Sequence, residues 1–351
     1  MISVAIIGAG VMGAAMSLPL SDRGYLVRLV GTPLDQAAIE SVKTTHFHPR
    51  LNVTLPASVV AFQHTQLADA FEDGLDLIVL GVASAGVNWA VEQLALVLKK
   101  PLPVLLVTKG MAADEHNLST LVDTVALALE KALGFSIPVA GIGGPCIAGE
   151  LAVRRPTGTV IVAHDFQLAA QLCEKLLTDY YQPRPSIDVI GVETCAAFKN
   201  FFAIAVGWAH GALQTKPPAE NKAQNNNAAA ILFDQAIREM LVLTKSLGGA
   251  AESVWGMPGA GDLYVTCQAG RNSRLGQHLG RGLSYHEVKH GPMKDETIEG
   301  AELGLSVASS IHAMIRSGKL YSEKLPLTLA LLNALQTNTN FNPPWDAFHR
   351  S

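Results

Sequence analysis

The chain opens with the stretch VAIIGAGVMG at residues 4–13, and this stretch decides the fold. The apolar run Val4–Ile7 predicts a buried strand, and Val11–Arg23 predicts the helix that follows it. Between them lies the spacing G-x-G-x-x-G, which in a strand–turn–helix context is typical of a dinucleotide-binding turn. We expect this turn to bind the cofactor through the five residues Gly8, Gly10, Val11, Met12 and Gly13.

Each glycine of this turn has a separate physical task. Gly8 permits the tight turn, Gly10 lets the backbone approach a pyrophosphate, and Gly13 allows close packing of helix on strand. The free N–H groups of Val11 and Met12 open the helix, where the helix dipole favours an anion.

Apolar runs alternate with amphipathic stretches through the first half of the chain, which predicts βαβ units and a parallel sheet. The predicted strands are Leu26–Val30, Leu75–Leu80, Val104–Val107, Ile137–Gly141 and Thr159–Val162, and the predicted helices are Val87–Leu98, Leu118–Leu133 and Phe166–Thr178. We therefore expect an α/β, Rossmann-type domain.

The pattern changes to helices alone after about residue 190. The predicted helices are Glu193–Leu213, Asn226–Leu247, Thr297–Ser317 and Leu325–Leu335. The sequence thus predicts a Rossmann domain at 1–190 and an all-α domain at 191–351 that completes the active site. A surface loop is expected at 216–227, because Pro217, Pro218 and a run of asparagines lie there.

Composition excludes several classes of protein. The chain is 49% apolar and 16% charged with a net charge of −4, so it carries no bulk attraction for nucleic acid or anionic membranes. The 4 cysteines lie far apart, which favours a reducing cytoplasm over a disulfide framework or a zinc finger. We expect no signal peptide, because the N-terminus opens directly into an apolar strand without a basic segment or cleavage site. We expect no membrane span, because the longest apolar stretch, Phe201–Leu213, is short and contains His210.

The choice between NAD and NADP depends on the end of the second predicted strand. NAD sites usually carry an acid there, which bonds the ribose 2′-OH, whereas this chain has Val30-Gly31-Thr32-Pro33. The sequence therefore leans to NADP, with Thr32 as a donor to the 2′-phosphate. Arg50 is the candidate cation if its loop folds back, and an exposed loop arginine if it does not.

Further motifs follow in an order that is hard to obtain by chance. They are Thr108-Lys109-Gly110, the turn GGPCIAGE at residues 143–150, ETCAAFKN at 193–200, GAGDLYVTC at 259–267 followed by Arg271-Asn272, and TIEG at 297–300. This set resembles the NAD(P)-dependent glycerol-3-phosphate dehydrogenase family, in an atypical, archaeal-like form, from the glycine turn to about Gly304.

The resemblance implies reversible reduction of dihydroxyacetone phosphate to sn-glycerol 3-phosphate, in phospholipid synthesis or glycerol phosphate catabolism. It implies that Lys199 exchanges the proton with the carbonyl oxygen, that Lys109 touches substrate and cofactor, and that Asp262 orients Lys199. It also implies substrate contacts at Gly144, Cys146, Gly270, Arg271 and Asn272, and cofactor contacts at Ala148, Arg271 and Glu299.

Elementary chemistry agrees with these implied roles. Hydride that arrives at a carbonyl carbon leaves charge on the oxygen, which a protonated lysine neutralises. The fork of an arginine suits a phosphate dianion.

The chain departs from the family pattern at several of these positions. Val11-Met12 replaces the frequent Ser-Trp, and Thr32 replaces the frequent arginine after the second strand. Cys146 replaces a hydroxyl residue, and Gly270 replaces serine. Substrate contacts are therefore expected to differ at Cys146 and Gly270.

The remaining histidine and cysteine patterns have structural explanations. His286-Glu287-Val288-Lys289-His290 has the spacing of a zinc-protease helix, but Gly291-Pro292 ends that helix and no third ligand is evident, so no metal is expected. His46 and His48 are interpreted as loop residues, and Cys195 and Cys267 as small packing residues.

Two rival functions remain at this point. One is a related two-domain reductase of another small hydroxy acid. The other is a redox sensor that binds dinucleotide without turnover, which would have no need of Lys109, Lys199 and Arg271 together.

A homodimer is also expected, because the apolar C-terminal helices leave surface to cover.

Overall fold

The computed structural model describes residues 2–72, 74–215, 217 and 222–350. The chain forms two compact units, one of residues 1–109 with 120–189 and the other of residues 110–119 with 190–351. The predicted division at residue 190 differs from this in the short segment 110–119. The predicted loop at 216–227 falls partly outside the described residues.

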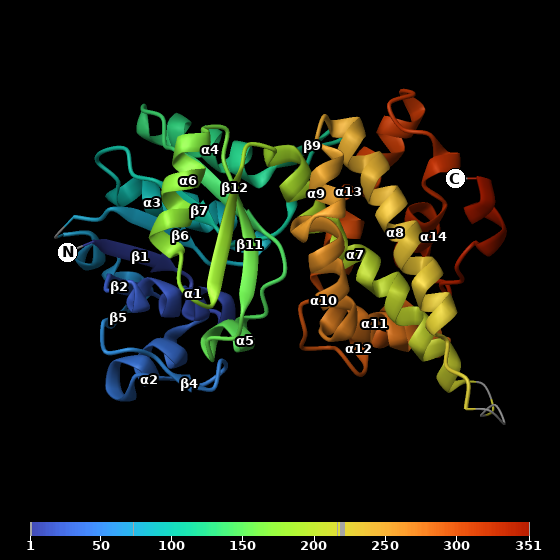
Figure 1. The fold of residues 1–351 in the computed structure, drawn as a ribbon, viewed down its shortest axis with the longest axis horizontal. Helices are drawn as coiled ribbons and strands as arrows, with labels where there is room; N and C mark the ends of the chain where they lie inside the picture. Colours follow the sequence, from blue (N-terminus) through green and yellow to red (C-terminus); the bar gives the residue numbers. More distant parts are fainter. Residues whose placement is uncertain (1, 73, 216, 218–221, 351) are drawn as a thin grey trace. The chain divides into compact units, whose positions relative to one another are not determined.

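The first unit is built on an 8-stranded sheet in the order β12-β11-β10-β7-β6-β1-β2-β5 (Figure 1). Its strands are β1 (Ser3–Ile7), β2 (Leu26–Val30), β5 (Val59–Phe62), β6 (Leu77–Leu80), β7 (Val104–Leu106), β10 (Val139–Gly143), β11 (Thr157–Val162) and β12 (Tyr181–Ser186). From β5 to β10 every pairing is parallel, β11 is antiparallel to β10, and β12 runs parallel to β11. The Rossmann-type sheet predicted from the sequence is confirmed.

This strand order places a topological switch point at β1, because the chain runs from β1 outward to β2 and β5, and then returns to β6 on the other side of β1. Ligands of open α/β sheets bind at the carboxyl ends of the strands beside such a point. The glycine turn follows β1 directly, so the fold puts it where a ligand is expected.

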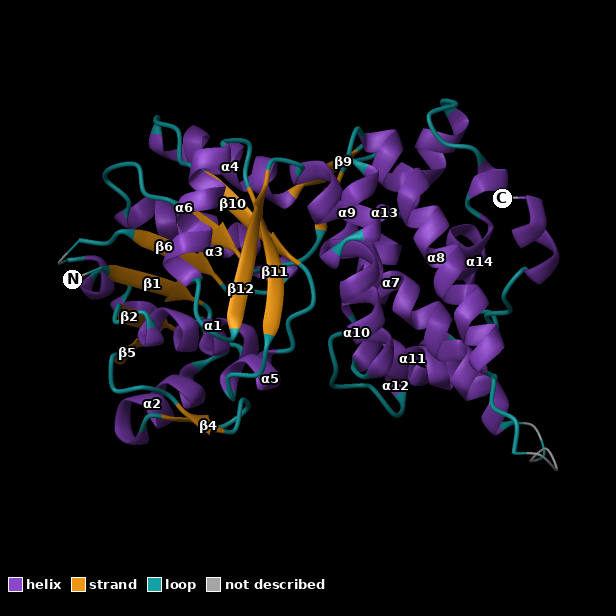
Figure 2. Ribbon diagram, viewed as in Figure 1, coloured by secondary structure: helices purple, strands orange, loops and turns teal. Residues whose placement is uncertain are grey.

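Helices flank the sheet of this unit (Figure 2). They are α1 (Val11–Asp22), α2 (Gln36–Thr45), α3 (Val87–Val97), α4 (Leu121–Leu133), α5 (Ala148–Ala152) and α6 (Phe166–Leu176), and a short hairpin of β3 (Phe47–His48) and β4 (Val53–Thr54) lies beyond α2. The sequence did not predict α2, β5 or β12. Strand β12 contains Pro183 and Pro185, which an edge strand tolerates because one of its sides has no partner.

The second unit is helical apart from one hairpin. Its helices are α7 (Val189–Gln214), α8 (Asn226–Leu247), α9 (Ala251–Trp255), α10 (Asp262–Gln268), α11 (Arg271–Gly280), α12 (Tyr285–His290), α13 (Glu299–Arg316) and α14 (Pro326–Thr337). Strands β8 (Met111–Ala113) and β9 (Leu118–Thr120) form the hairpin. The helix predicted to begin at Leu118 therefore begins only at Leu121, where the hydroxyl of Thr120 caps it.

Helix α7 runs through the core of the second unit. Its aromatic residues Phe198, Phe201 and Phe202 are fully buried and pack edge to face or tilted on one another. The helix is long and apolar enough to cross a membrane, with a mean hydropathy of 1.5, but 94% of that window is buried in the fold. Burial on this scale is that of a core helix, as the sequence predicted for Phe201–Leu213.

Candidate functional site

The glycine turn of the first unit is shaped by backbone contacts. Gly8 has a φ of +108°, and a Cβ placed there would lie 2.7 Å from the carbonyl carbon and oxygen of Gly81, which follows β6. A Cβ at Gly13 would lie 2.0 Å from the carbonyl oxygen of Gly8. At Gly10 the nearest atom to a Cβ would be 4.0 Å away. Two glycines therefore close the turn, and the third leaves space beside it.

Helix α1 begins at this open space without a side-chain cap. Gly10 is its N-cap residue and makes no side-chain hydrogen bond, and the first turn contains no acidic residue. The first N–H groups of a helix need acceptors, and together with the helix dipole they attract an anion. The turn thus offers a pyrophosphate both the space beside Gly10 and the N–H groups at the start of α1.

A buried carboxylate lies beside the same turn, at a position the sequence interpretation missed. Asp35 is 5% exposed, and its Oδ2 accepts hydrogen bonds from the N–H of Ala9 at 3.2 Å and from the N–H and hydroxyl of Thr32 at 3.0 and 2.7 Å. An acid is therefore present near the end of β2, where the sequence interpretation found none, and it lies five residues beyond the strand. Its spacing of three from Thr32 was the available signal.

The loop that carries Arg50 folds back onto this turn. Arg50 Nη2 lies 2.5 Å from Asp35 Oδ1 and 3.5 Å from the carbonyl oxygen of Ala9. His48, interpreted from the sequence as a loop residue, is fully buried, and its Nε2 lies 2.9 Å from the same Ala9 oxygen. The hydroxyl hydrogen of Thr32, predicted as a donor to the cofactor, is donated to Asp35 instead.

Lys109 and Gly144 meet at the carboxyl ends of β7 and β10. The Nζ of Lys109 donates to the carbonyl oxygen of Gly144 at 3.1 Å. The hydroxyl of Ser84 donates to the carbonyl oxygen of Lys109 at 3.0 Å, and that of Thr108 to Val82 at 2.7 Å, so the backbone around the lysine is held in place. Cys146 is half-buried and Ala148 opens α5 just beyond this point.

In the second unit a buried lysine has a carboxylate and a hydroxyl as partners. Lys199, on α7, is 7% exposed, and its Nζ donates to Asp262 Oδ1 at 2.9 Å and to Thr266 Oγ1 at 2.7 Å. Thr266 in turn donates to the carbonyl oxygen of Asp262 at 2.7 Å, so its hydroxyl can only accept from the lysine. The sequence motif contains Thr266, but its role was not predicted.

A π-helical segment leads into α10, and a buried cysteine follows Thr266 on that helix. Five residues in π-helical geometry, Met257–Gly261, precede Asp262, and such insertions are frequent at functional sites. Cys267 follows Thr266 on the same helix. Burial raises the pKa of its thiol to about 12, although the nearby Lys199 ammonium opposes the shift. The thiol is therefore neutral at physiological pH, in keeping with its interpretation as a packing residue.

A network of amides and charges lies next to Lys199. Asn272 Nδ2 donates to Asn200 Oδ1 at 3.0 Å, and Asn200 Nδ2 donates to Glu299 Oε2 at 3.2 Å. The N–H of Gly300 donates to Asn272 Oδ1 at 2.9 Å, and Arg271 Nη2 lies 3.2 Å from Glu299 Oε1. The structure thus brings Arg271, Asn272 and Glu299 together, and it adds Asn200, whose role the sequence left unassigned.

Close backbone packing makes this network possible. A Cβ at Gly211 of α7 would lie 1.9 Å from the carbonyl oxygen of Gln277 on α11, and one at Gly276 of α11 would lie 2.0 Å from the carbonyl oxygen of Ile204 on α7. A Cβ at Gly300 of α13 would likewise lie 2.3 Å from the carbonyl oxygen of Asn200 on α7. Three helices therefore touch along glycines, and their polar residues meet at hydrogen-bonding distance.

Gly270 differs from the family's serine for a backbone reason. Its φ is +114°, a region that side chains rarely adopt, and it is the N-cap residue of α11. The helix that carries Arg271 and Asn272 begins there. A serine in this backbone conformation would be strained, so the departure belongs to the geometry of the turn.

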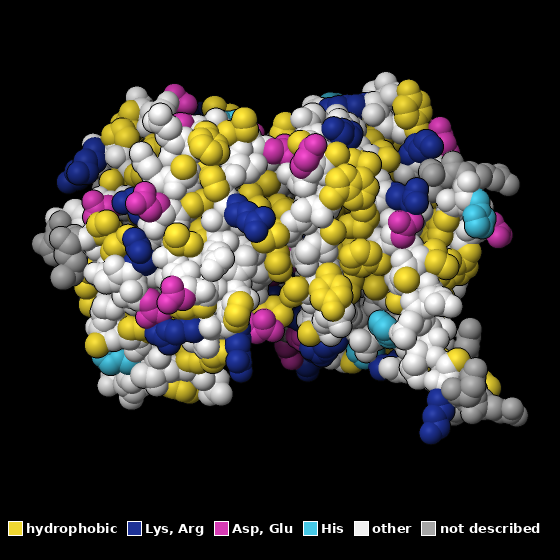
Figure 3. Space-filling view, in the orientation of Figure 1, with side chains coloured by type: hydrophobic (Ala, Val, Ile, Leu, Met, Phe, Trp, Pro, Cys, Tyr) yellow, Lys and Arg dark blue, Asp and Glu magenta, His cyan; other side chains and the backbone are white. Residues whose placement is uncertain are grey.

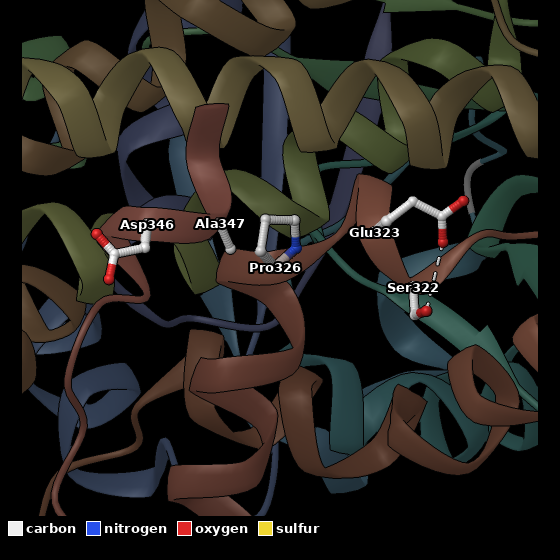
Figure 4. Close-up of a pocket in the computed structure, with 5 residues that line it drawn as sticks. All are labelled: Ser322, Glu323, Pro326, Asp346 and Ala347. Carbon is white, nitrogen blue, oxygen red and sulfur yellow. Dashed lines mark hydrogen bonds between the residues drawn. The ribbon is translucent and has the colours of Figure 1, made fainter. Parts of the chain in front are cut away.

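Two further features lie outside these clusters. A cavity of about 420 Å³ is lined by Ser322, Glu323, Pro326, Asp346 and Ala347, none of which was predicted as a site residue. Figure 4 shows its two carboxylates at opposite ends.

In α12, Glu287 accepts from the N–H and hydroxyl of Ser284 at 2.7 and 2.8 Å, as a helix cap. Among the residues described, no three metal-ligating side chains gather in one group.

Comparisons with known proteins cover almost the whole chain. Residues 3–169 match the model of the NAD-dependent glycerol-3-phosphate dehydrogenase N-terminus, and residues 188–344 match that of its C-terminus. An NADP(+)-dependent glycerol-3-phosphate dehydrogenase of Archaeoglobus fulgidus is 33% identical over 315 residues, which are 88% of this chain and 91% of that protein. A glycerol-3-phosphate dehydrogenase [NAD(P)+] of Exiguobacterium is 32% identical, over 95% of this chain and 91% of its own.

A solved structure agrees with these matches. The crystal structure of glycerol-3-phosphate dehydrogenase from Coxiella burnetii superposes with a TM-score of 0.79 at 26% identity, and the match covers 99% of this chain and 97% of that one.

Proposed function

The chain belongs to the NAD-dependent glycerol-3-phosphate dehydrogenase family and interconverts dihydroxyacetone phosphate and sn-glycerol 3-phosphate with NAD(P)H, and we propose that Lys199 moves the proton in this reaction. The observation that carries the proposal is the buried contact of Lys199 with Asp262 and Thr266. Membership of this family sets aside both rivals, the reductase of another hydroxy acid and the sensor without turnover.

The contacts of Lys199 suit a group that works on one oxygen atom. The bound pyridine nucleotide supplies or accepts the hydride. When negative charge develops on the carbonyl oxygen, the Lys199 ammonium stabilises it and donates a proton, and in the reverse direction the amine accepts one. Asp262 favours the charged ammonium, and Thr266 fixes its direction because its oxygen can only accept.

The phosphate of the substrate is assigned to Arg271, with Asn272 beside it. The side chain of Arg271 is 44% exposed and pairs with the equally accessible Glu299, so its guanidinium is within reach of a ligand. Arginine binds phosphate in two parallel hydrogen bonds, which fixes orientation as well as charge. Lys109, Gly144, Cys146 and Gly270 remain assigned to the substrate as predicted, and Lys109 to the cofactor as well.

The cofactor is assigned to the glycine turn, with Ala148, Arg271 and Glu299 as further predicted contacts. Thr32 was predicted as well, but its hydroxyl donates to Asp35. The space beside Gly10 and the uncapped start of α1 support the assignment. The preference for NADP is also part of the proposal, and it is supported by the NADP(+)-dependent relative from Archaeoglobus fulgidus.

The cellular location, the partners and the oligomeric state of the protein are also part of the proposal. Cys146, Cys173, Cys195 and Cys267 are all free thiols, which supports a reducing cytoplasm. On the face drawn in Figure 3, basic side chains are scattered and mixed with acidic ones. That no nucleic acid binds stays a prediction. The homodimer stays a prediction, for which sedimentation at several concentrations is the measurement.

The test of Lys199 separates chemistry from binding. Initial rates of NADPH and NADH oxidation with dihydroxyacetone phosphate are measured for the native protein, for Lys199→Ala and for Lys245→Ala, which removes an exposed lysine from α8. We expect Lys199→Ala to lower kcat by roughly 100- to 10,000-fold, the usual share of a general acid. Its cofactor Kd, followed by nucleotide fluorescence, stays within about twofold, and Lys245→Ala behaves as the native protein.

One result would contradict the proposal, and another would disqualify the variant as a test. A kcat for Lys199→Ala within about tenfold of the native value would remove the lysine from the proton transfer. Loss of cofactor binding in the same variant, with a lowered melting temperature, would show that the substitution had damaged the fold instead.

A further inference from the structure

The corner of the first unit where β2 ends holds an ion pair that suits one of the two nicotinamide cofactors. The ribose 2′ position of a dinucleotide lies at this corner in Rossmann domains, where NAD sites place a free carboxylate and NADP sites place a cation. Here the corner holds both Asp35 and Arg50, in contact with each other and with Ala9 of the glycine turn.

Asp35 is already occupied by donors from the protein. One of its oxygens accepts from Ala9 and twice from Thr32, and the other faces Arg50. A carboxylate accepts at about four lone-pair positions in all, so four donors saturate it. The carboxylate that would bind the 2′-OH of NAD is thus used to hold the turn and the arginine.

Arg50 is held but not enclosed. Its contacts with Asp35 and Ala9 both use Nη2, and its side chain is 54% exposed, so the rest of the fork faces outward beside the turn. A guanidinium has five N–H donors in a planar fork that matches the oxygens of a phosphate. An arginine fixed at one nitrogen loses less rotational freedom when the others bind, which favours affinity.

His48 fixes the loop that carries Arg50. Its Nδ1 accepts from the N–H of Leu51 at 3.0 Å, so the hydrogen must be on Nε2, which donates to the carbonyl oxygen of Ala9 at 2.9 Å. The ring is fully buried and spans from the loop to the glycine turn. The distance of Arg50 from the turn is therefore set by His48 as well as by Asp35.

We propose that Arg50, oriented by Asp35 and positioned by His48, binds the 2′-phosphate of NADP and gives the enzyme its preference for that cofactor. This inference rests on the proposed function only in that the turn binds a nicotinamide dinucleotide. The discriminating residue is supplied by the loop after α2, because Thr32 stands where the family frequently has an arginine at the end of β2.

The test measures binding without turnover. Calorimetric Kd values are determined for NADP, NAD and adenosine 2′,5′-bisphosphate, a probe that carries the 2′-phosphate but cannot react. The variants are Arg50→Gln, Arg50→Lys and His48→Gln, with Arg23→Gln as the matched control, because Arg23 is an exposed arginine at the far end of α1. Circular dichroism confirms that each variant is folded.

We expect the native protein to bind NADP more tightly than NAD. Arg50→Gln weakens NADP and the bisphosphate by roughly 10- to 100-fold, the effect of one or two lost charge-assisted hydrogen bonds, and changes the Kd for NAD by less than about threefold. Arg50→Lys, which keeps the charge without the fork, loses less. His48→Gln shifts the NADP-to-NAD ratio in the same direction, and Arg23→Gln shifts neither Kd.

Three results would overturn the inference. One is a native protein that binds NAD as tightly as NADP. The second is an Arg50→Gln variant whose Kd for the bisphosphate is unchanged. The third is an equal loss of NADP and NAD affinity in that variant, which would make Arg50 a brace for the turn and no more. Because the probe does not react, a failure of the proposed proton transfer at Lys199 leaves all these measurements interpretable.

Discussion

The two units carry proposed functional residues of different kinds, a backbone half in the first unit and a side-chain half in the second. In the first unit the turn proposed to bind the dinucleotide is built on the backbone of three glycines, Gly8, Gly10 and Gly13. In the second unit the site consists of buried side chains, Lys199 with Asp262 and Thr266, and Asn200 with Asn272, held in hydrogen bonds. The backbone half needs local residues in a fixed spacing, whereas the side-chain half needs helices that meet from distant parts of the chain.

Glycines serve both halves, but in different ways. In the turn, Gly8 and Gly13 let one strand and one helix approach each other, over a few residues. In the second unit, Gly211 and Gly276 let helices α7 and α11 touch, which brings Asn200 and Asn272 to hydrogen-bonding distance. Under the proposed function, glycine would therefore govern cofactor binding in one unit and catalytic geometry in the other, and substitutions can separate the two effects.

The largest effect is expected from Gly13→Ala in the turn. The added Cβ would lie 2.0 Å from the carbonyl oxygen of Gly8, so α1 must move away from β1 and the phosphate site is distorted. We expect the Kd for NADP and NAD to rise by at least about 100-fold, close to the whole contribution of such a site's best contacts. The matched control is Gly149→Ala on α5, where nothing lies within 4 Å of a Cβ.

This variant also tests whether the two halves are independent. The second unit keeps its own core, so its hydrogen-bonded amides around Lys199 should retain their protection from hydrogen exchange. Loss of that protection in Gly13→Ala would break the comparison, because damage to the turn would then have reached the second unit's buried side chains.

A smaller effect is expected from Gly211→Ala on α7. The Cβ would lie 1.9 Å from the carbonyl oxygen of Gln277, so α11 must shift and carry Asn272 away from Asn200. We expect the free energy of unfolding to fall by about 2 kcal/mol, a typical cost of overpacking, and kcat to fall with it. Urea denaturation and initial rates are the measurements.

The cofactor Kd decides what Gly211→Ala means. It should rise far less than in Gly13→Ala, since the glycine turn lies in the other unit's sheet and only the proposed cofactor contacts Arg271 and Glu299 lie in this one. A kcat that does not change, in spite of the lost stability, would show that the glycine contacts hold the helices together without setting the catalytic geometry.

The smallest effect concerns a buried acid far from either cluster. Burial raises the pKa of Glu239 to about 7, although hydrogen bonds from Gln235 and from the start of α14, at Leu327 and Thr328, oppose the shift. The folded protein thus keeps this proton at pH values where the unfolded chain has lost it. Its stabilising effect is complete below about pH 4.5 and is lost as the pH rises to about 7.

Denaturation curves between pH 4.5 and 8 measure this contribution. We expect the free energy of unfolding to decline over that range by a few kcal/mol at most, after other groups are accounted for with Glu239→Gln. The variant loses this slope, even if its stability is lower throughout. An identical slope in both proteins would show that Glu239 is ionised in the folded state as it is in the unfolded one.

Sequence alone predicted the backbone half in detail and the side-chain half in part. The turn at Gly8, Gly10 and Gly13 is confirmed in place because strand, turn and helix are neighbours in the chain. Lys199 and Asp262 are 63 residues apart, and Asn272 and Asn200 are 72 apart, so their meeting depends on how helices pack. Periodicity does not contain that information, and only the family resemblance suggested these residues.

The missed residues share a cause. Asp35, His48 and Thr266 act through hydrogen bonds to backbone or to another functional side chain, and such partners leave no spacing pattern of their own. The helices α9–α12 were missed because they are short, and most of their apolar positions face neighbours that the sequence does not reveal.

The segment of residues 110–119 has a consequence for how this gene can be divided. The chain leaves the first unit at residue 109, forms the β8–β9 hairpin in the second, and returns by residue 120. Within the second unit, the hydroxyl of Ser310 on α13 donates to the carbonyl oxygen of Asp114 in that hairpin. A fragment expressed from residue 190 onward would lack its own hairpin, and no single recombination point could exchange one unit between relatives without splitting the other.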